Sequence, residues 1–100
     1  MVVKDKRGRR RYIAFTVCAE TTTSKGQLLY KLRERSSQMG IDEPRLVQFD
    51  GEKGIIRCPH VLKDEMIEMM NSLNGEMEIR TLATSGTLKS LRDRYFQDPP

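Results

Sequence analysis

Hydrophobic and polar residues alternate with a period of two near the start of the chain, over residues 11–19. One face of the alternation carries Ile13, Phe15 and Val17, and the other carries Tyr12, Ala14, Thr16 and Cys18. Successive side chains of a strand point to opposite faces, and β-branched and aromatic residues favour strands. The segment therefore predicts a strand that packs against a core on one side.

Two later segments have the spacing of amphipathic helices. The first carries Leu28, Leu29, Leu32, Ser36 and Met39, follows N-cap candidates at 21–24, and ends at Gly40. The second carries Leu62, Met66, Met69 and Leu73, with Ile67 and Met70 beside them, and ends at Gly75. Such stripes usually face the core, so the methionines are expected to pack inside the protein.

Between these helices lie two short apolar runs, 46–49 and 55–58. The joining residues include Asp50-Gly51 and then Gly54, which is typical of a hairpin because both glycines tolerate positive φ. If Arg57 faces solvent, Ile56 and Cys58 face the core. Cys18 lies on the opposite face of the first strand, which argues against a disulfide.

Residues 76–84 alternate again, with Met77 and Ile79 as inward positions, and Leu88, Leu91 and Tyr95 form the stripe of a last helix. The order β-α-β-β-α-β predicts an α+β, ferredoxin-like split βαβ fold. Its four-stranded antiparallel sheet would carry two helices on one face, plus the C-terminal helix. The other face would stay open, as a candidate for protein contact. We expect a basic arm at 1–11, one domain at 12–96 and a frayed tail at 97–100.

The charge of the chain is concentrated at its N-terminus. The net charge is +4, and residues 1–11 carry six of the 18 basic residues and one of the 14 acidic residues. Blocks of like charge stay extended and often contact nucleic acid, although a solvated tail is the alternative. No apolar run approaches the roughly 20 residues that cross a bilayer, so we expect a cytoplasmic protein without membrane contact.

The residues offer little for catalysis. His60, Cys18 and Cys58 are fewer than the four ligands of a structural zinc site, and no third group orients a His/Cys pair. We therefore expect no catalytic residue, metal or cofactor in this chain. RNA-recognition motifs of this fold stack bases on strand aromatics, but residues 53–58 contain none.

Three stretches resemble the archaeal ribonuclease P protein component 2 family, which is related to a small subunit of eukaryotic nuclear ribonuclease P. They are Arg9-Arg10-Arg11-Tyr12-Ile13, Gly54-Ile55-Ile56-Arg57 and Thr84-Ser85-Gly86-Thr87-Leu88-Lys89. The last looks like the Ser-Gly-Thr-Ile/Leu-Arg/Lys signature of that family, and it is the most distinctive.

The resemblance implies a subunit of the ribonucleoprotein endonuclease that removes the 5′ leader from precursor tRNA. In that family the RNA performs the chemistry with Mg²⁺ bound by the RNA. The implied partners are this catalytic RNA and a second, larger protein subunit, with precursor tRNA as the substrate of the complex. A homodimer contact is also possible.

The candidate RNA-binding residues are basic side chains near both ends of the chain, together with the Ser-Gly-Thr motif. They are Lys4, Lys6, Arg7, Arg9, Arg10, Arg11, Lys53, Arg57, Ser85, Gly86, Thr87, Lys89, Arg92 and Arg94. The motif has two interpretations. It binds a phosphate at the start of the last helix, or the side chain of Ser85 or Thr87 simply caps that helix.

Other functions compete with this interpretation. A free-standing RNA-binding protein of the same fold, of the ribosomal or RNA-chaperone type, would share the basic arm. A regulatory domain for a small ligand also uses this topology, although the arm counts against it. A small phosphatase of this fold would need an anion-binding loop with arginine and asparagine, and Asn71 and Asn74 are badly placed for that role.

Overall fold

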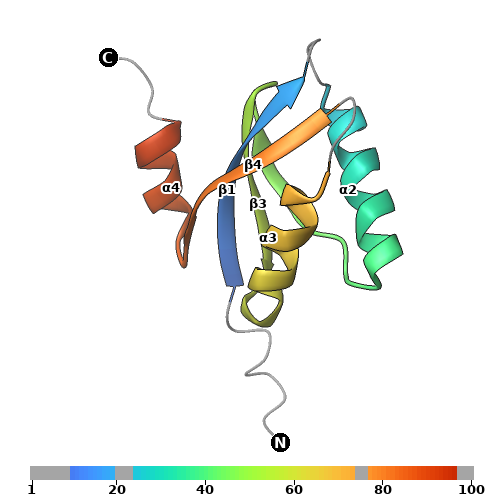
Figure 1. The fold of residues 1–100 in the computed structure, drawn as a ribbon. Coiled ribbons are helices and arrows are strands. Elements are labelled where there is room, and N and C mark those ends of the chain that lie inside the picture. Colours follow the sequence, from blue (N-terminus) through green and yellow to red (C-terminus); the bar gives the residue numbers. More distant parts are fainter. Residues whose placement is uncertain (1–9, 20–23, 74–76, 97–100) are drawn as a thin grey trace, which may run out of the picture.

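The computed structural model describes residues 10–19, 24–73 and 77–96. In chain order the elements are β1 (Arg10–Ala19), α2 (Lys25–Met39), β2 (Arg45–Phe49), β3 (Lys53–Pro59), the 3-10 helix η1 (His60–Leu62), α3 (Lys63–Asn71), β4 (Met77–Ser85) and α4 (Leu88–Tyr95). The strands form one antiparallel sheet in the order β2-β3-β1-β4 (Figure 1). The predicted ferredoxin-like α+β fold is confirmed.

The start and end of α2 follow from its terminal residues. Ser24 is the N-cap, and its hydroxyl accepts from the backbone N–H of Gln27 while the Gln27 side chain accepts from the backbone N–H of Ser24. This reciprocal pair satisfies two helix-end donors. Gly40 ends the helix with φ +73°, a conformation that favours glycine. Both signals were readable in the sequence.

The larger core lies between the sheet and the two helices α2 and α3 (Figure 1). β1 contributes the predicted inward side chains Ile13, Phe15 and Val17, and β3 contributes Ile56 and Cys58. The helices contribute Leu28, Leu32, Met66, Met69 and Met70. The methionine stripe of α3 is thus core, as predicted, and its flexible side chains fill space between two layers.

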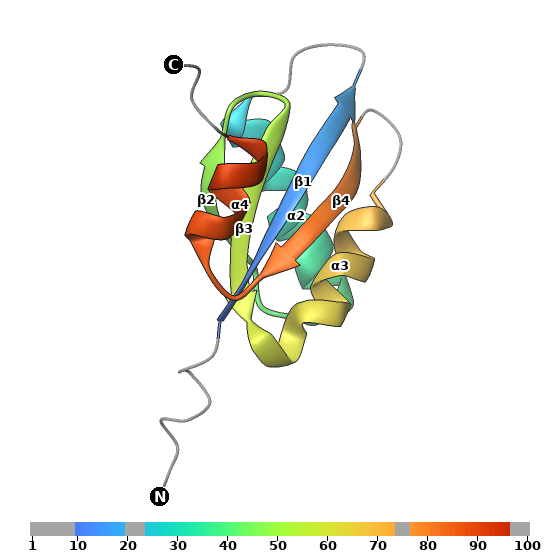
Figure 2. The ribbon, with the colours of Figure 1, turned by 90° about the vertical axis from the view of Figure 1, so that its left-hand side faces the viewer.

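The opposite face of the sheet is not open as predicted, because α4 packs on it (Figure 2). Leu91 is fully buried there against Ala14 of β1 and Ile55 of β3. The apolar side of α4 is removed from water by packing on the side chains of this sheet face. In Figure 2, α4 lies mainly in front of β3 and β2. Cys18, Glu78 and Arg80 on β1 and β4 remain exposed.

Gly54 has a different role from the one expected. Gly51 turns the hairpin with φ +102°, and the Asp50 carboxylate accepts from the N–H groups of Glu52 and Lys53. Gly54 has no positive φ and lies inside β3. A Cβ at this position would lie 2.6 Å from Phe15 Cζ and 2.8 Å from the Gln48 carbonyl oxygen. Glycine is therefore required for close packing of strand against ring.

The structure also bears on two further predictions, the extent of the basic arm and the state of the two cysteines. β1 begins at Arg10, so Arg10 and Arg11 belong to the strand and not to the arm. Cys18 is exposed, Cys58 is buried, and both are free, so the argument against a disulfide is confirmed. Within the described parts of the chain no helix is long and apolar enough to span a membrane.

Candidate nucleic-acid interface

A row of residues crosses all four strands at one end of the sheet. Arg45 pairs with Arg57, Arg57 pairs with Tyr12, and Tyr12 pairs with Ser85. Directly paired residues of antiparallel strands project to the same face. Two arginines therefore lie side by side on the face that carries α4, near the point where β4 passes into that helix. Arg45 is exposed and Arg57 is half-buried.

One residue earlier on β1, Arg11 reaches the same end of the molecule from the other face of the strand. Its Nε donates to Nδ1 of His60 at 3.0 Å. A Cβ built on Gly86 would lie 3.7 Å from Nη1 of Arg11, which is ordinary contact distance. The Arg11 guanidinium thus lies between η1 and the turn that follows β4. Arg10, at the start of the strand, is exposed.

The turn Ser85-Gly86-Thr87 connects β4 to α4. Thr87 occupies the N-cap position in extended conformation, but in the described structure its side chain accepts no helix N–H. The Ser85 hydroxyl instead accepts from the backbone N–H of Thr87 at 3.1 Å. Of the two interpretations of the motif, the plain side-chain cap does not match the structure, because Ser85 closes the turn and no side chain at the N-cap accepts from a helix N–H.

The basic residues of α4 each have a partner within the protein. Lys89 donates to Asp93 at 2.9 Å, Arg92 Nε donates to Gln48 Oε1 at 2.8 Å, and the Arg94 guanidinium lies 5.5 Å from the centre of the Tyr95 ring. The hydrogen bond to Asp93, with its negative charge, raises the pKa of Lys89. All three cations are exposed. Lys89 and Arg92 are i,i+3 neighbours on one side of α4, whereas Arg94 lies on another side, so the three do not form one continuous basic stripe.

The remaining predicted contacts lie apart from this end. Lys53 pairs with Thr16 at the far end of β3, so it does not join Arg57. Lys4, Lys6, Arg7 and Arg9 lie outside the described residues. The structure therefore gathers the predicted residues Arg10, Arg11, Arg57, Ser85, Gly86 and Thr87 at one end of the sheet. Together with Arg45 and His60, which lie beside them, we call this set the basic end.

Sequence reasoning missed two residues of the basic end. Arg45 joins it because a register shift between Leu46 and Gln48 brings Arg45 opposite Arg57, and hairpin length alone does not reveal that shift. His60 was considered only as a nucleophile partner or metal ligand. Its position directly after Pro59, which pairs with Arg10, is the one signal that could have placed it beside the N-terminal arginines.

The described residues hold no group of three or more His, Cys, Asp or Glu side chains that could bind a metal. Cys58 lies in the core, and burial raises the pKa of its thiol, an effect that the positive charge of Lys63 partly opposes. A thiol held in its protonated form is a poor nucleophile. Cys58 therefore suits a role in core packing better than a role as a catalytic nucleophile.

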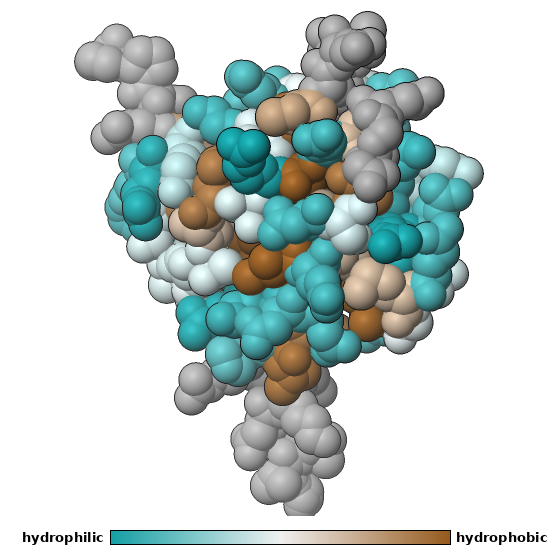
Figure 3. Space-filling view, in the orientation of Figure 1, coloured by the Kyte–Doolittle hydropathy of each residue, from teal (hydrophilic) through white to brown (hydrophobic). Residues whose placement is uncertain are grey.

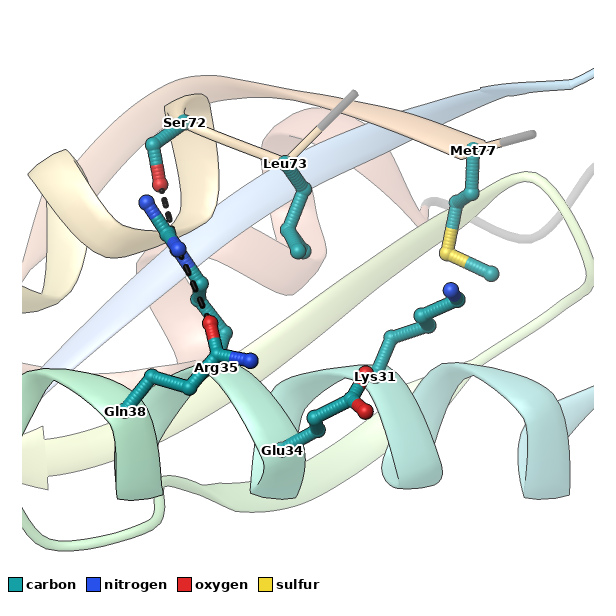
Figure 4. A pocket seen from close by; sticks show the side chains of 7 residues that line it. All are labelled: Lys31, Glu34, Arg35, Gln38, Ser72, Leu73 and Met77. Carbon is teal, nitrogen blue, oxygen red and sulfur yellow. Dashed lines mark hydrogen bonds between the residues drawn. The ribbon is translucent and has the colours of Figure 1, made fainter. Parts of the chain in front are cut away.

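A second candidate site is a cavity of about 310 Å³ where α2 meets the end of α3 and the start of β4 (Figure 4). Arg35 lies in it and donates to the hydroxyl of Ser72 and to Oε1 of Gln38. Lys31 and Glu34 bring opposite charges to the same cavity. The arginine links the two helices, and the mixed charges give no preference for an anion, so the basic end is the stronger candidate.

The view of the surface in Figure 3 shows hydrophobic side chains in patches separated by hydrophilic ones. Among the described residues, the large hydrophobic side chains that are exposed are Tyr30, Val61 and Leu82. They come from α2, η1 and β4, so they do not form a single apolar surface. Charge, more than apolar area, distinguishes the surface of this molecule.

Comparison with known proteins yields a consistent set of relatives. The chain is 33% identical over 100 residues to ribonuclease P protein component 2 of Archaeoglobus fulgidus, covering 91% of this chain and 92% of that protein. It is 31% identical to the protein of the same name from Thermococcus kodakarensis, covering 92% and 87%. A chain in the structure of yeast ribonuclease MRP matches the fold with a TM-score of 0.68, 12% identity, and coverage of 90% and 93%. No family model matches the sequence.

Proposed function

Because the chain belongs to the ribonuclease P protein component 2 family, we propose that it is a protein subunit of ribonuclease P. In this role it supports the catalytic RNA during removal of the 5′ leader from precursor tRNA. The RNA performs the hydrolysis with its own Mg²⁺, and this chain contributes no catalytic residue. The observation that carries the proposal is the 33% identity to the Archaeoglobus protein across almost the full length of both chains.

The basic end supplies the physical means for holding RNA. Arg10, Arg45 and Arg57 present positive charge at one end of the sheet, and Arg11 adds a fourth guanidinium beside Gly86. Arginine forms paired hydrogen bonds with phosphate oxygens, which suits it to an RNA backbone. The fold brings these arginines together from three strands, whereas in the sequence Arg45 and Arg57 follow Arg10 and Arg11 by 34 positions or more.

The mechanism is electrostatic. Each cation that neutralises a phosphate releases condensed counterions, and folded RNA segments that repel each other can then approach. In the sequence, Lys4, Lys6, Arg7 and Arg9 precede β1 and supply further positive charge. Affinity should fall with salt by a slope of roughly −0.7 to −0.9 per phosphate neutralised. Because Arg10 opens β1, a truncation that tests the arm alone should end at Arg9.

The proposed assembly also includes a second, larger protein subunit and a contact between two copies of this chain. The complex acts on precursor tRNA in the cytoplasm.

Reconstitution tests the proposal. The full chain, its companion subunit and the cognate ribonuclease P RNA would be combined, and cleavage of precursor tRNA measured at limiting Mg²⁺. Wild-type protein should restore cleavage, and the variant Arg10→Gln/Arg57→Gln should restore much less. The matched control is Lys25→Gln/Arg33→Gln, which removes the same charge from α2. Equal activity of the two variants would exclude the basic end, and no stimulation by wild type would exclude the function.

A further inference from the structure

His60 is the only histidine of the chain, and it contacts Arg11 from a segment 49 residues away. The imidazole begins η1, directly after β3, and accepts at Nδ1 from Arg11 Nε at 3.0 Å. Both side chains are half-buried. Accepting at Nδ1 requires a lone pair there, so the ring proton of the neutral imidazole is on Nε2.

The contact fixes one end of the Arg11 side chain and leaves the other end free to act. Nε faces His60, while Nη1 lies at the turn, 3.7 Å from the Cβ position of Gly86. An unrestrained arginine loses rotamer entropy when it is ordered. A guanidinium already ordered in the free protein avoids part of that cost on binding.

The chemistry of the acceptor matters as much as its position. A carboxylate in place of His60 would also order Arg11, but it would cancel the positive charge, as Glu43 does for Arg33 at 3.3 Å. A neutral imidazole orders the guanidinium and leaves its charge intact. Arg10, the neighbour of Arg11 on β1, adds to that charge, whereas Lys63 is paired with the exposed Asp64 at 3.5 Å.

We propose that His60 is a positioning residue for RNA binding: it holds the Arg11 guanidinium against the Ser85-Gly86-Thr87 turn with its charge unneutralised, ready for a phosphate of the RNA. The inference rests on the proposed function, because it names how one contact of the same basic end is arranged. His60 touches no substrate in this arrangement and acts through Arg11.

A double-mutant cycle tests whether His60 acts through Arg11. The affinity of the full chain for the cognate ribonuclease P RNA would be measured by fluorescence anisotropy for wild type, Arg11→Ala, His60→Ala and the double variant. Arg11→Ala should weaken binding about fivefold and His60→Ala about threefold. The double variant should bind no more weakly than Arg11→Ala, because His60 has no effect once its partner is gone.

Two amide variants separate positioning from general packing. The Asn side-chain oxygen occupies nearly the place of Nδ1, so His60→Asn should bind RNA like wild type. The Gln oxygen lies one bond farther along, near the place of Nε2, so His60→Gln should reproduce the loss of His60→Ala. Thermal unfolding of each variant identifies any that fail to fold. If His60→Ala fails, the test compares His60→Asn with His60→Gln.

The outcomes separate the inference from the function. If His60→Ala weakened RNA binding as much in the Arg11→Ala variant as in wild type, His60 would act independently of Arg11. The inference would then fail. No loss in either single variant, with salt-dependent binding by wild type, also overturns the inference alone. Wild-type protein that binds no RNA at low salt overturns the proposed function itself.

Discussion

The two faces of the sheet differ in how many side chains they bury. The face toward α2 and α3 buries a cluster of twelve residues, whereas the face toward α4 buries three, namely Ala14, Ile55 and Leu91. Stability scales roughly with the apolar area removed from water. The first face, which we call the deep face, therefore supplies most of the stability of the fold. The second face only attaches one short helix to the sheet.

This difference bears on the candidate interface because the basic end lies where the two regions join. α4 has eight residues, which is too short for an isolated helix to be stable in water. It depends on Leu91, on the partly buried side chains around it, and on the hydrogen bond from Arg92 to Gln48. Elements with few buried contacts open locally at a lower free energy than the whole domain. The Ser85-Gly86-Thr87 turn is the start of such an element.

The largest effect is expected in the deep face, from Phe15→Ala. Phe15 is fully buried, faces the Phe49 ring at 6.3 Å between centroids, and lies against Gly54. Its loss leaves a cavity under two helices, and the free energy of unfolding should fall by about 3–5 kcal/mol. Urea unfolding followed by circular dichroism measures this. A loss below about 1 kcal/mol would mean that this face is not the main source of stability.

Neighbouring isoleucines on β3 provide a matched comparison of the two faces. Ile55 and Ile56 are both fully buried, but Ile55 lies in the small cluster and Ile56 in the large one. Ile56→Ala should cost about 4 kcal/mol and Ile55→Ala about 2 kcal/mol, because α4 can settle into the space more easily than two packed helices can. Equal losses in urea unfolding would remove the distinction between the faces.

Much of the deep face was predictable from the sequence. Period-two alternation assigned Ile13, Phe15 and Val17 to one side of β1, and helical spacing assigned Leu28 and Leu32 to the core. Local periodicity determines these positions, because a strand or helix must bury its apolar side somewhere. The same reasoning found the stripe of α4 without revealing which surface it covers, since a stripe does not identify its partner.

The basic end was predictable in composition but not in arrangement. The arginines and the Ser-Gly-Thr motif stood out in the sequence, whereas the contact of Arg11 with His60 depends on the pairing of β1 with β3. The role of Gly54 was hidden for the same reason, because its close neighbour Phe15 is distant in sequence. Register is a long-range property, and bulges in two strand pairs alter it.

A smaller effect should separate the two arginines that attach helices to their neighbours. Arg92→Ala removes the hydrogen bond between α4 and Gln48, and Arg35→Ala removes the one between α2 and Ser72. Each bond contributes about 1 kcal/mol. Amide hydrogen exchange should become faster throughout α4 in Arg92→Ala, but should change little in α2 in Arg35→Ala, where Leu28 and Leu32 hold the helix. Equally fast exchange in both helices would contradict the comparison.

The smallest effect concerns the pH dependence of stability that the buried thiol of Cys58 contributes. Burial of Cys58 raises its pKa above the usual 9.0, with the charge of Lys63 acting in the opposite direction. Well below pH 9.0 the thiol is protonated in the folded and unfolded chain alike, so it adds no pH dependence. Above that value the unfolded chain releases the proton first, so the free energy of unfolding falls as pH rises, until the folded-state pKa is passed.

Variants of the two cysteines isolate this contribution from the other groups that titrate in alkali. Urea unfolding would be compared at about pH 8 and about pH 10 for wild type, Cys58→Ala and Cys18→Ala. The fall in stability should be smaller in Cys58→Ala, because a buried group that resists ionisation has been removed from the deep face. Cys18→Ala changes an exposed side chain, so the wild-type fall should persist. If both variants kept the full fall, the buried environment of Cys58 would not control its protonation, and the deep face would be less closed to water than its packing indicates.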